Sequence, residues 1–83
     1  MSSAFGKGTK ANGEQQMVVG RYNNYTITDA YFMVGMGTDD SHRRNALAVM
    51  TDGTLAIPNF NSNGDIIGTK RIKCVNGVLT VID

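Results

Sequence analysis

The chain has 83 residues and a mass of 8.9 kDa, and it carries eight Lys and Arg against seven Asp and Glu, for a formal net charge of +1. A chain this short forms one domain at most, and its near-neutral charge excludes the basic field that nucleic acid or an anionic membrane surface would require. One cysteine excludes an intrachain disulfide, and no apolar run approaches the ~20 residues of a membrane span, so we expect no membrane insertion.

The composition also predicts the fold class. Ten glycines and one proline accompany many Asn and Thr residues. Glycine and asparagine favour turns and threonine favours strands, whereas the Ala, Leu, Glu and Lys typical of helical bundles are not in excess. We therefore predict an all-β fold with almost no helix.

A short repeat opens the chain. Gly6, Gly13 and Gly20 stand seven residues apart, and Gly35 follows one residue later than two further periods would place it. Seven residues allow a short strand and a corner at which glycine adopts a positive φ, so two units predict one 14-residue coil. A β-meander with evenly spaced turn glycines is the alternative. A small or aliphatic residue stands two positions before each of the first three glycines: Ala4, Ala11 and Val18.

Aromatic residues follow the repeat, at Tyr22, Tyr25, Tyr31 and Phe32. Exposed tyrosines suit carbohydrate binding, because the ring offers an apolar face and the hydroxyl offers a hydrogen bond. Packing between the repeat region and the next hairpin is the alternative that we favour. Tyr22 and Tyr25 are therefore kept as candidate surface recognition residues.

The densest group of charges lies in residues 39–44. Asp39, Asp40, His42 and Arg43 are candidate recognition residues, because paired carboxylates suit a divalent cation or acid–base chemistry and histidine suits metal binding. The favoured interpretation is a solvated loop in which Asp39 or Asp40 pairs with Arg44. A lone histidine beside arginines makes a poor ligand set, so we expect no metal site.

Two β-rich runs surround Asp52 and Gly53 in residues 47–57. An Asp-Gly pair between such runs favours a two-residue type I′ turn. Apolar side chains would then lie on both faces of the hairpin. Counting outward from that turn predicts the pairs Thr51–Thr54, Met50–Leu55, Val49–Ala56 and Ala48–Ile57.

The repeat resembles the head repeats of trimeric autotransporter adhesins, in which A-x-G units recur along a left-handed parallel β-roll. Four further elements follow in order: G-x-Y-N at residues 20–23, F-x-V-G-x-G-T at 32–38, R-x-N-A-L-x-V at 43–49 and D-G at 52–53. This order resembles a pattern of bacteriophage tail and minor structural proteins and of prophage fibre proteins. The resemblance implies a trimeric fibre, tailspike or baseplate component, located in the virion or outside the cell after synthesis in the host cytoplasm.

The chain ends with a second hairpin. After a polar connector at residues 58–69, Asn76 and Gly77 form a two-residue turn signal between two β-rich runs. We expect Cys74 to be a buried small hydrophobe rather than a nucleophile, because no base is placed to activate it. The predicted pairs are Val75–Val78, Cys74–Leu79, Lys73–Thr80, Ile72–Val81, Arg71–Ile82 and Lys70–Asp83.

This hairpin is apolar on both faces, with Ile72, Cys74, Leu79 and Val81 on one face and Val75, Val78 and Ile82 on the other. A two-stranded hairpin is marginal in water, and so short a chain offers little to cover it. We therefore expect the chain to oligomerise. The resemblance implies an intertwined homotrimer.

The expected organisation is a β-roll-like repeat region at residues 1–37, a polar loop and hairpin at 38–57, and a connector and hairpin at 58–83, all within one structural domain. No Ser/His/Asp, paired-carboxylate or Cys/His arrangement stands out, so we predict no enzyme and no cofactor. The leading hypothesis is a structural, trimerisation or host-recognition segment that binds a host-surface glycan or protein receptor. The head of a bacterial surface adhesin and a non-catalytic appendage of a glycan-degrading phage protein are the alternatives. Because patterned sequence begins directly after Met1, we also expect a segment of a longer protein.

Overall fold

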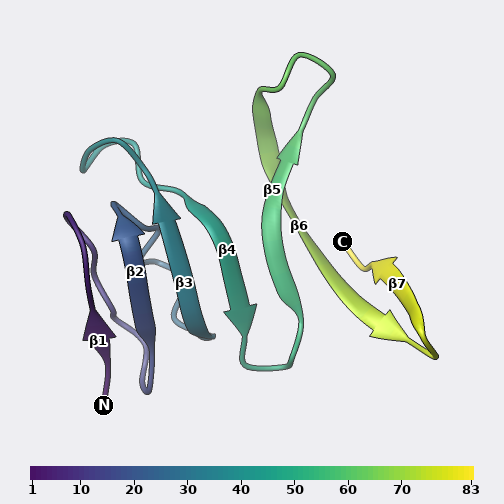
Figure 1. The fold of residues 1–83 in the computed structure, drawn as a ribbon, viewed down its shortest axis with the longest axis horizontal. Helices are drawn as coiled ribbons and strands as arrows, with labels where there is room; N and C mark the ends of the chain where they lie inside the picture. The colour runs from purple at the N-terminus through teal and green to yellow at the C-terminus, as the bar shows by residue number, and fades with distance from the viewer.

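The computed structural model describes residues 1–83 and shows a single seven-stranded mixed sheet with no helix (Figure 1). The predicted all-β class is confirmed. Strands follow one another across the sheet in chain order, and no helix is present that could cross a membrane. The strands are β1 (Ser3–Ala4), β2 (Met17–Arg21), β3 (Ala30–Met36), β4 (Asn45–Met50), β5 (Leu55–Phe60), β6 (Ile66–Val75) and β7 (Val78–Val81).

The first three strands are parallel, as the resemblance to A-x-G coils implied. Ala4 pairs with Val18 and Val18 pairs with Met33, so successive coils bring equivalent residues into one row after 14 and then 15 residues. Gly20 pairs with Gly35 in the same way. The seven-residue spacing is therefore half of a coil, and the extra residue before Gly35 lies in the second coil.

The glycines of the repeat serve two purposes. Gly6 and Gly20 have φ values of +120° and +96°, so the predicted positive φ is confirmed for both, although Gly20 lies within β2 rather than at a corner. Gly13 and Gly35 do not adopt a positive φ, so that part of the prediction is wrong for both, although Gly13 does lie at a bend, directly before the turn at Glu14 and Gln15. Gly35 lies within β3, where a Cβ would stand 2.5 Å from the carbonyl oxygen of Arg21, so its lack of a side chain permits close approach of neighbouring backbone.

The hairpin between β4 and β5 differs from the predicted register by one residue. Ala48 pairs with Ala56 and Val49 with Leu55, so the loop contains three residues rather than two. The Gly53 amide donates to the Met50 carbonyl at 3.0 Å, and Gly53 has a φ of +89°. This is a type I turn followed by a left-handed glycine, the usual three-residue hairpin loop.

The C-terminal hairpin has the predicted register. Val75 pairs with Val78, and the next three pairs also match. Asn76 and Gly77 have φ values of 50° and 82°, as a type I′ turn requires. The local Asn-Gly signal was sufficient to place this turn.

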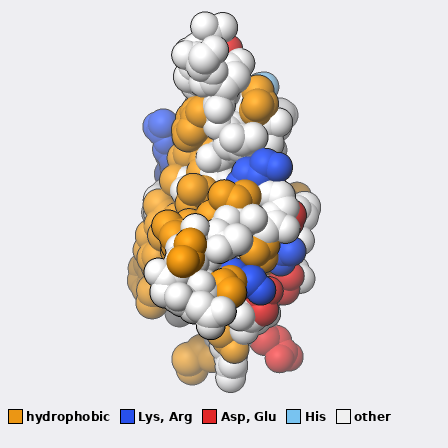
Figure 2. All heavy atoms as spheres, turned by 90° about the vertical axis from the view of Figure 1, so that its right-hand side faces the viewer, with side chains coloured by type: hydrophobic (Ala, Val, Ile, Leu, Met, Phe, Trp, Pro, Cys, Tyr) orange, Lys and Arg blue, Asp and Glu red, His pale blue; other side chains and the backbone are white.

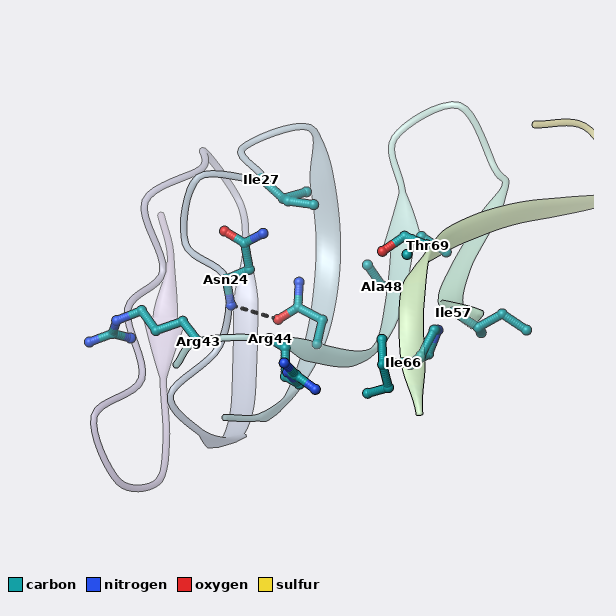
Figure 3. A pocket seen from close by; sticks show the side chains of 12 residues that line it. Asn24, Ile27, Arg43, Arg44, Ala48, Ile57, Ile66 and Thr69 are labelled. Carbon is teal, nitrogen blue, oxygen red and sulfur yellow. Dashed lines mark hydrogen bonds between the residues drawn. The ribbon is translucent and has the colours of Figure 1, made fainter. Parts of the chain in front are cut away.

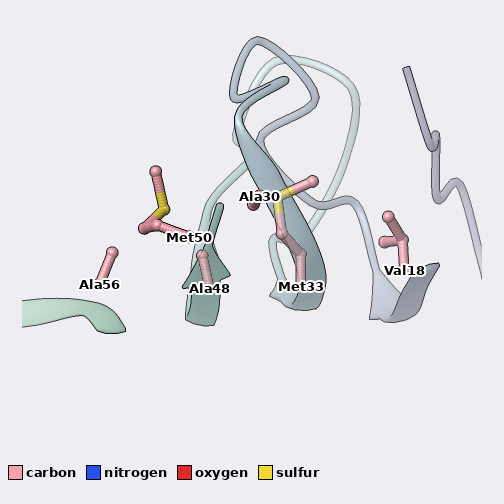
Figure 4. Close-up of a cluster of buried hydrophobic side chains, with 6 residues drawn as sticks. All are labelled: Val18, Ala30, Met33, Ala48, Met50 and Ala56. Atoms are coloured by element: carbon pink, nitrogen blue, oxygen red, sulfur yellow. The ribbon is translucent and has the colours of Figure 1, made fainter. Parts of the chain in front are cut away.

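The hydrophobic core is small and lies on one face of the sheet (Figure 4). Paired residues on neighbouring strands point to the same face, so Val18, Met33, Ala48 and Ala56 form a row across four strands. Coil residues, among them Ala11 and Ile27, pack against this row. The complete core is Val18, Ala30, Met33, Ala48, Met50 and Ala56.

The opposite side of the sheet is apolar and has no covering layer. We call it the open face. The molecule measures 36 × 34 × 16 Å, and orange side chains gather along one side of this slab (Figure 2). Met17 and Val81, at the two ends of the row, are 44% and 63% exposed, and the residues between them are half-buried. The row that defines the open face is Met17, Phe32, Val49, Leu55, Ile72 and Val81.

Candidate functional site

The polar loop after β3 is held by its own hydrogen bonds. Thr38 donates its amide to the His42 carbonyl at 3.0 Å, and Asp39 Oδ1 accepts the Ser41 amide at 2.9 Å. His42 Nδ1 lies 2.8 Å from the same carboxylate oxygen. The hydrogen bond from His42 is the main cause that lowers the pKa of Asp39. Both side chains remain exposed, so the loop presents a small polar tip to solvent.

Arg43 is the structural centre of this region. It pairs with Asp40, so the expected pairing through Arg44 is wrong. Its guanidinium also donates to the carbonyl oxygens of Gly8 at 2.8 Å and Asn23 at 3.3 Å, and its side chain is only 9% exposed. Arg43 therefore ties the first coil to the polar loop and has little surface left for recognition.

The aromatic residues do not form one cluster. Arg43 lies over the rings of Tyr22 and Tyr25, at 5.4 and 4.9 Å from their centroids, and Lys10 lies over Tyr25 at 4.7 Å. These two tyrosines are half-buried, whereas Tyr31 is 49% exposed. Tyr22 and Tyr25 thus pack among the coils, and their faces are already occupied by cations.

Two buried amides missed by the sequence analysis join the coils. Asn23 accepts the Lys10 amide at 2.8 Å and donates to the Lys10 carbonyl at 2.9 Å. Gln16 donates to the carbonyl oxygens of Ile27 and Ala30 at 3.2 and 3.0 Å. The G-x-Y-N element contained the signal for Asn23, but no local pattern marks Gln16, because its partners lie 11 and 14 residues away.

A cleft of about 90 Å³ lies between the coil ends and the β5–β6 hairpin (Figure 3). Its wall includes Asn24 and Arg44 from the coil side and Ile66 from β6. The backbone amide of Asn24 donates to Asn45 Oδ1 at 2.9 Å and fixes the coil end beside β4. No local sequence pattern links these residues, because they come from segments that are distant along the chain.

The remaining side chains that could act as nucleophiles or metal ligands do not lie together. Cys74 is exposed on the C-terminal hairpin, so the prediction that it is buried is wrong for a single copy of the chain. No three His, Cys, Asp or Glu side chains form a group that could hold a metal ion.

Comparisons with protein-family models, with curated proteins and with solved structures find no match to this chain. We therefore infer function from the sheet and its exposed surfaces.

Proposed function

We propose that this chain is a non-catalytic structural segment of a homotrimeric phage or prophage fibre, tailspike or baseplate protein. In this proposal, the parallel strands are a short β-roll and the hairpins assemble the trimer. The open face is the observation that carries the proposal. The in-register row of Ala4, Val18 and Met33 supports the resemblance to A-x-G coils, since such coils stack equivalent residues in successive rows. Val18 and Met33 are buried in this row, and Ala4 is exposed at the edge of the sheet.

The chain exposes more surface than an average folded monomer of its mass. The chain exposes 5305 Å², compared with about 4,800 Å² expected for a folded monomer of this mass. Only 12 of 83 residues are buried, and six of them form the core. A core of this size stabilises a monomer weakly, so a second source of burial is required.

The C-terminal hairpin favours a trimer over a dimer. Val78 is 64% exposed on one face, while Leu79 and Val81 are 70% and 63% exposed on the other. A twofold interface uses the same patch on both copies, so a dimer of this kind covers one face of each hairpin. A cyclic trimer gives every copy two different neighbours and covers both faces.

The energy available from this assembly is large for so small a domain. Burial of a few hundred Å² of apolar surface per copy, at about 25 cal/mol per Å², contributes several kcal/mol. That contribution is comparable with the whole free energy of unfolding of a small domain. Assembly and folding of the C-terminal hairpin are therefore coupled in this proposal.

The exposed tip at Asp39 and His42 is the element that we assign to contact with a host-surface glycan or protein receptor. It projects from the coil end, and neither side chain is needed by the core. A bacterial surface adhesin head would use the same coils and the same open face. Attachment of this segment to a coiled-coil stalk and membrane anchor in the parent protein would favour the adhesin.

The decisive test is the solution mass of the purified chain, measured by multi-angle light scattering after gel filtration. A mass of about three times 8.9 kDa that persists on dilution is the expected result. A monomer at all concentrations would contradict the proposal, because the open face would then be stable in water. A dimer would contradict the trimer and retain the shared face.

A further inference from the structure

We propose that the cleft between the coil ends and the β5–β6 hairpin binds a small carboxylate that carries a compact apolar group. The site is separate from the open face, because Ala48 and Ala56 in its wall belong to the core side of the sheet. The proposal goes beyond the structural role and does not depend on the number of copies that assemble.

The cleft exists because β4 and β5 separate. Their pairing is limited to Ala48 with Ala56 and Val49 with Leu55. On their outer sides, β4 continues to pair with β3 as far as Asn45, and β5 continues to pair with β6 as far as Phe60. Pro58 has no amide hydrogen to donate across this gap, which favours the separation. The resulting space of about 90 Å³ greatly exceeds the roughly 10–15 Å³ that one water needs.

Arg44 gives the cleft its positive charge. Arg43 and Arg71 are paired with Asp40 and Asp83, whereas Arg44 has no ion pair and no side-chain hydrogen bond within the chain. Figure 3 shows Arg44 on the side of the cleft that faces Ile66, while Arg43 points away. No carboxylate lines the cleft. A guanidinium presents two parallel N–H donors that match a carboxylate, so an anion can supply the missing partner.

The other residues of the cleft wall determine which uncharged group the ligand can carry beside its carboxylate. Ile27, Ala48, Ala56 and Ile66 provide an apolar surface beside Arg44, and Asn24 adds a polar edge. A ligand with a charged end and a few carbon atoms can therefore pair with Arg44 and bury its apolar part. The small volume excludes large apolar groups. Short aliphatic carboxylates are the simplest probes of this chemistry.

The test is a titration of the ¹⁵N-labelled chain with formate, acetate and butyrate, followed by two-dimensional NMR. We expect saturable shifts at residues around the cleft, with affinity rising about fourfold for each methylene that is buried. Butyramide has nearly the shape of butyrate without the charge and should bind roughly tenfold more weakly. Equal affinity for butyrate and butyramide would overturn the role of Arg44, and equal affinity for formate and butyrate would overturn the apolar wall.

Two variants distinguish butyrate binding at this cleft from nonspecific attraction of an anion to any arginine on the surface. Arg44→Gln should weaken butyrate binding roughly tenfold and leave the solution mass unchanged. Arg21→Gln removes an exposed arginine outside the cleft and should leave binding unchanged. Equal losses in both variants, or no saturable binding to the wild type, would overturn the proposal. A trimer that binds no butyrate refutes the cleft alone, whereas a monomer that binds butyrate refutes the trimer alone.

Discussion

Gly20 combines two constraints that experiment can separate. Its φ is +96°, and an added Cβ would overlap the carbonyl oxygen of Gly35 in the neighbouring strand. Gly64 has a similar φ of +86°, but a Cβ there would meet open space. The left-handed backbone alone disfavours alanine by about 1–2 kcal/mol. Close approach of two strands adds a steric penalty at Gly20 only.

We therefore expect Gly20→Ala to lower the free energy of unfolding by at least about twice as much as Gly64→Ala. Urea denaturation of the two variants and the wild type, monitored by far-ultraviolet circular dichroism, measures both changes. The Gly64 variant serves as the control for backbone strain. Equal losses in the two variants would show that the coils relax around the added methyl group.

Arg43 should be irreplaceable by lysine, although the charge is conserved. One guanidinium reaches two carbonyl oxygens and Asp40 while it lies over two tyrosine rings. A lysine ammonium cannot reproduce that planar arrangement, so we expect Arg43→Lys to lower the free energy of unfolding by about 1–3 kcal/mol. Urea denaturation is the measurement. Arg21→Lys, at an exposed position, should change stability by less than about 0.5 kcal/mol, and a similar loss in both would refute the bridging role.

The residues that could be predicted from the sequence are those with a local or periodic signal. The positive φ of Gly6 and Gly20 was predicted because their spacing repeats, and the core residues Val18 and Met33 lie two positions before a glycine. Arg43 could not be assigned in advance, since its acceptor on Gly8 is 35 residues away. Candidate sites built from long-range contacts, including the Arg44 cleft, require the fold itself.

At the scale of elements, the two hairpins show why one turn was predicted correctly and the other was not. An Asn-Gly pair fits the two positive φ values of a type I′ turn, and Asn76 and Gly77 have them. Asp-Gly is compatible with both a two-residue and a three-residue loop. The carboxylate of Asp52 accepts hydrogen bonds from the Thr54 amide at 3.0 Å and the Thr54 hydroxyl at 2.7 Å, which stabilises the longer loop. The register shift follows from that contact.

The end of the C-terminal hairpin should make stability depend on acid pH. Asp83 accepts hydrogen bonds from the amide and Nε of Arg71 at 3.0 and 2.9 Å, and these contacts lower the pKa of Asp83 below its ordinary value of 3.8. A carboxyl whose pKa is lowered by folding stabilises the native state fully above its ordinary pKa. That contribution is lost as the pH falls through the native pKa, because the unfolded chain binds the proton more readily.

We therefore expect urea midpoints to decline below about pH 4 and to decline less steeply in Asp83→Asn. Some dependence should remain in the variant, since the hydrogen bonds to Asp39 from His42 and to Asp52 from Thr54 also lower the pKa of each of those carboxyls. A series of urea denaturations from pH 6 to pH 2.5 measures the slope. An identical slope in wild type and variant would show that the Arg71–Asp83 pair is absent in solution.

At the scale of the whole molecule, oligomerisation was predicted from the hairpin alone, but the extent of the open face was not. Sequence places apolar residues on alternate positions of each strand, and only the pairing register aligns them into one row from β2 to β7. The row ends at Met17 and Val81, close to the two edges of the sheet. An apolar face that spans six strands is what a shared interface between copies requires.

Leu79 tests whether that face holds the copies together. Its side chain is 70% exposed in one copy, so Leu79→Asp removes little from the fold of a monomer and places a charge in the proposed interface. We expect light scattering to show a mass near 8.9 kDa for this variant, with the far-ultraviolet circular dichroism of the coils retained. Ser62→Asp adds the same charge at an exposed position of the β5–β6 loop, outside the C-terminal hairpin, and should leave the mass of the trimer unchanged. A trimeric Leu79→Asp variant would place the interface elsewhere, because burying three unpaired carboxylates in an apolar contact is too unfavourable to persist.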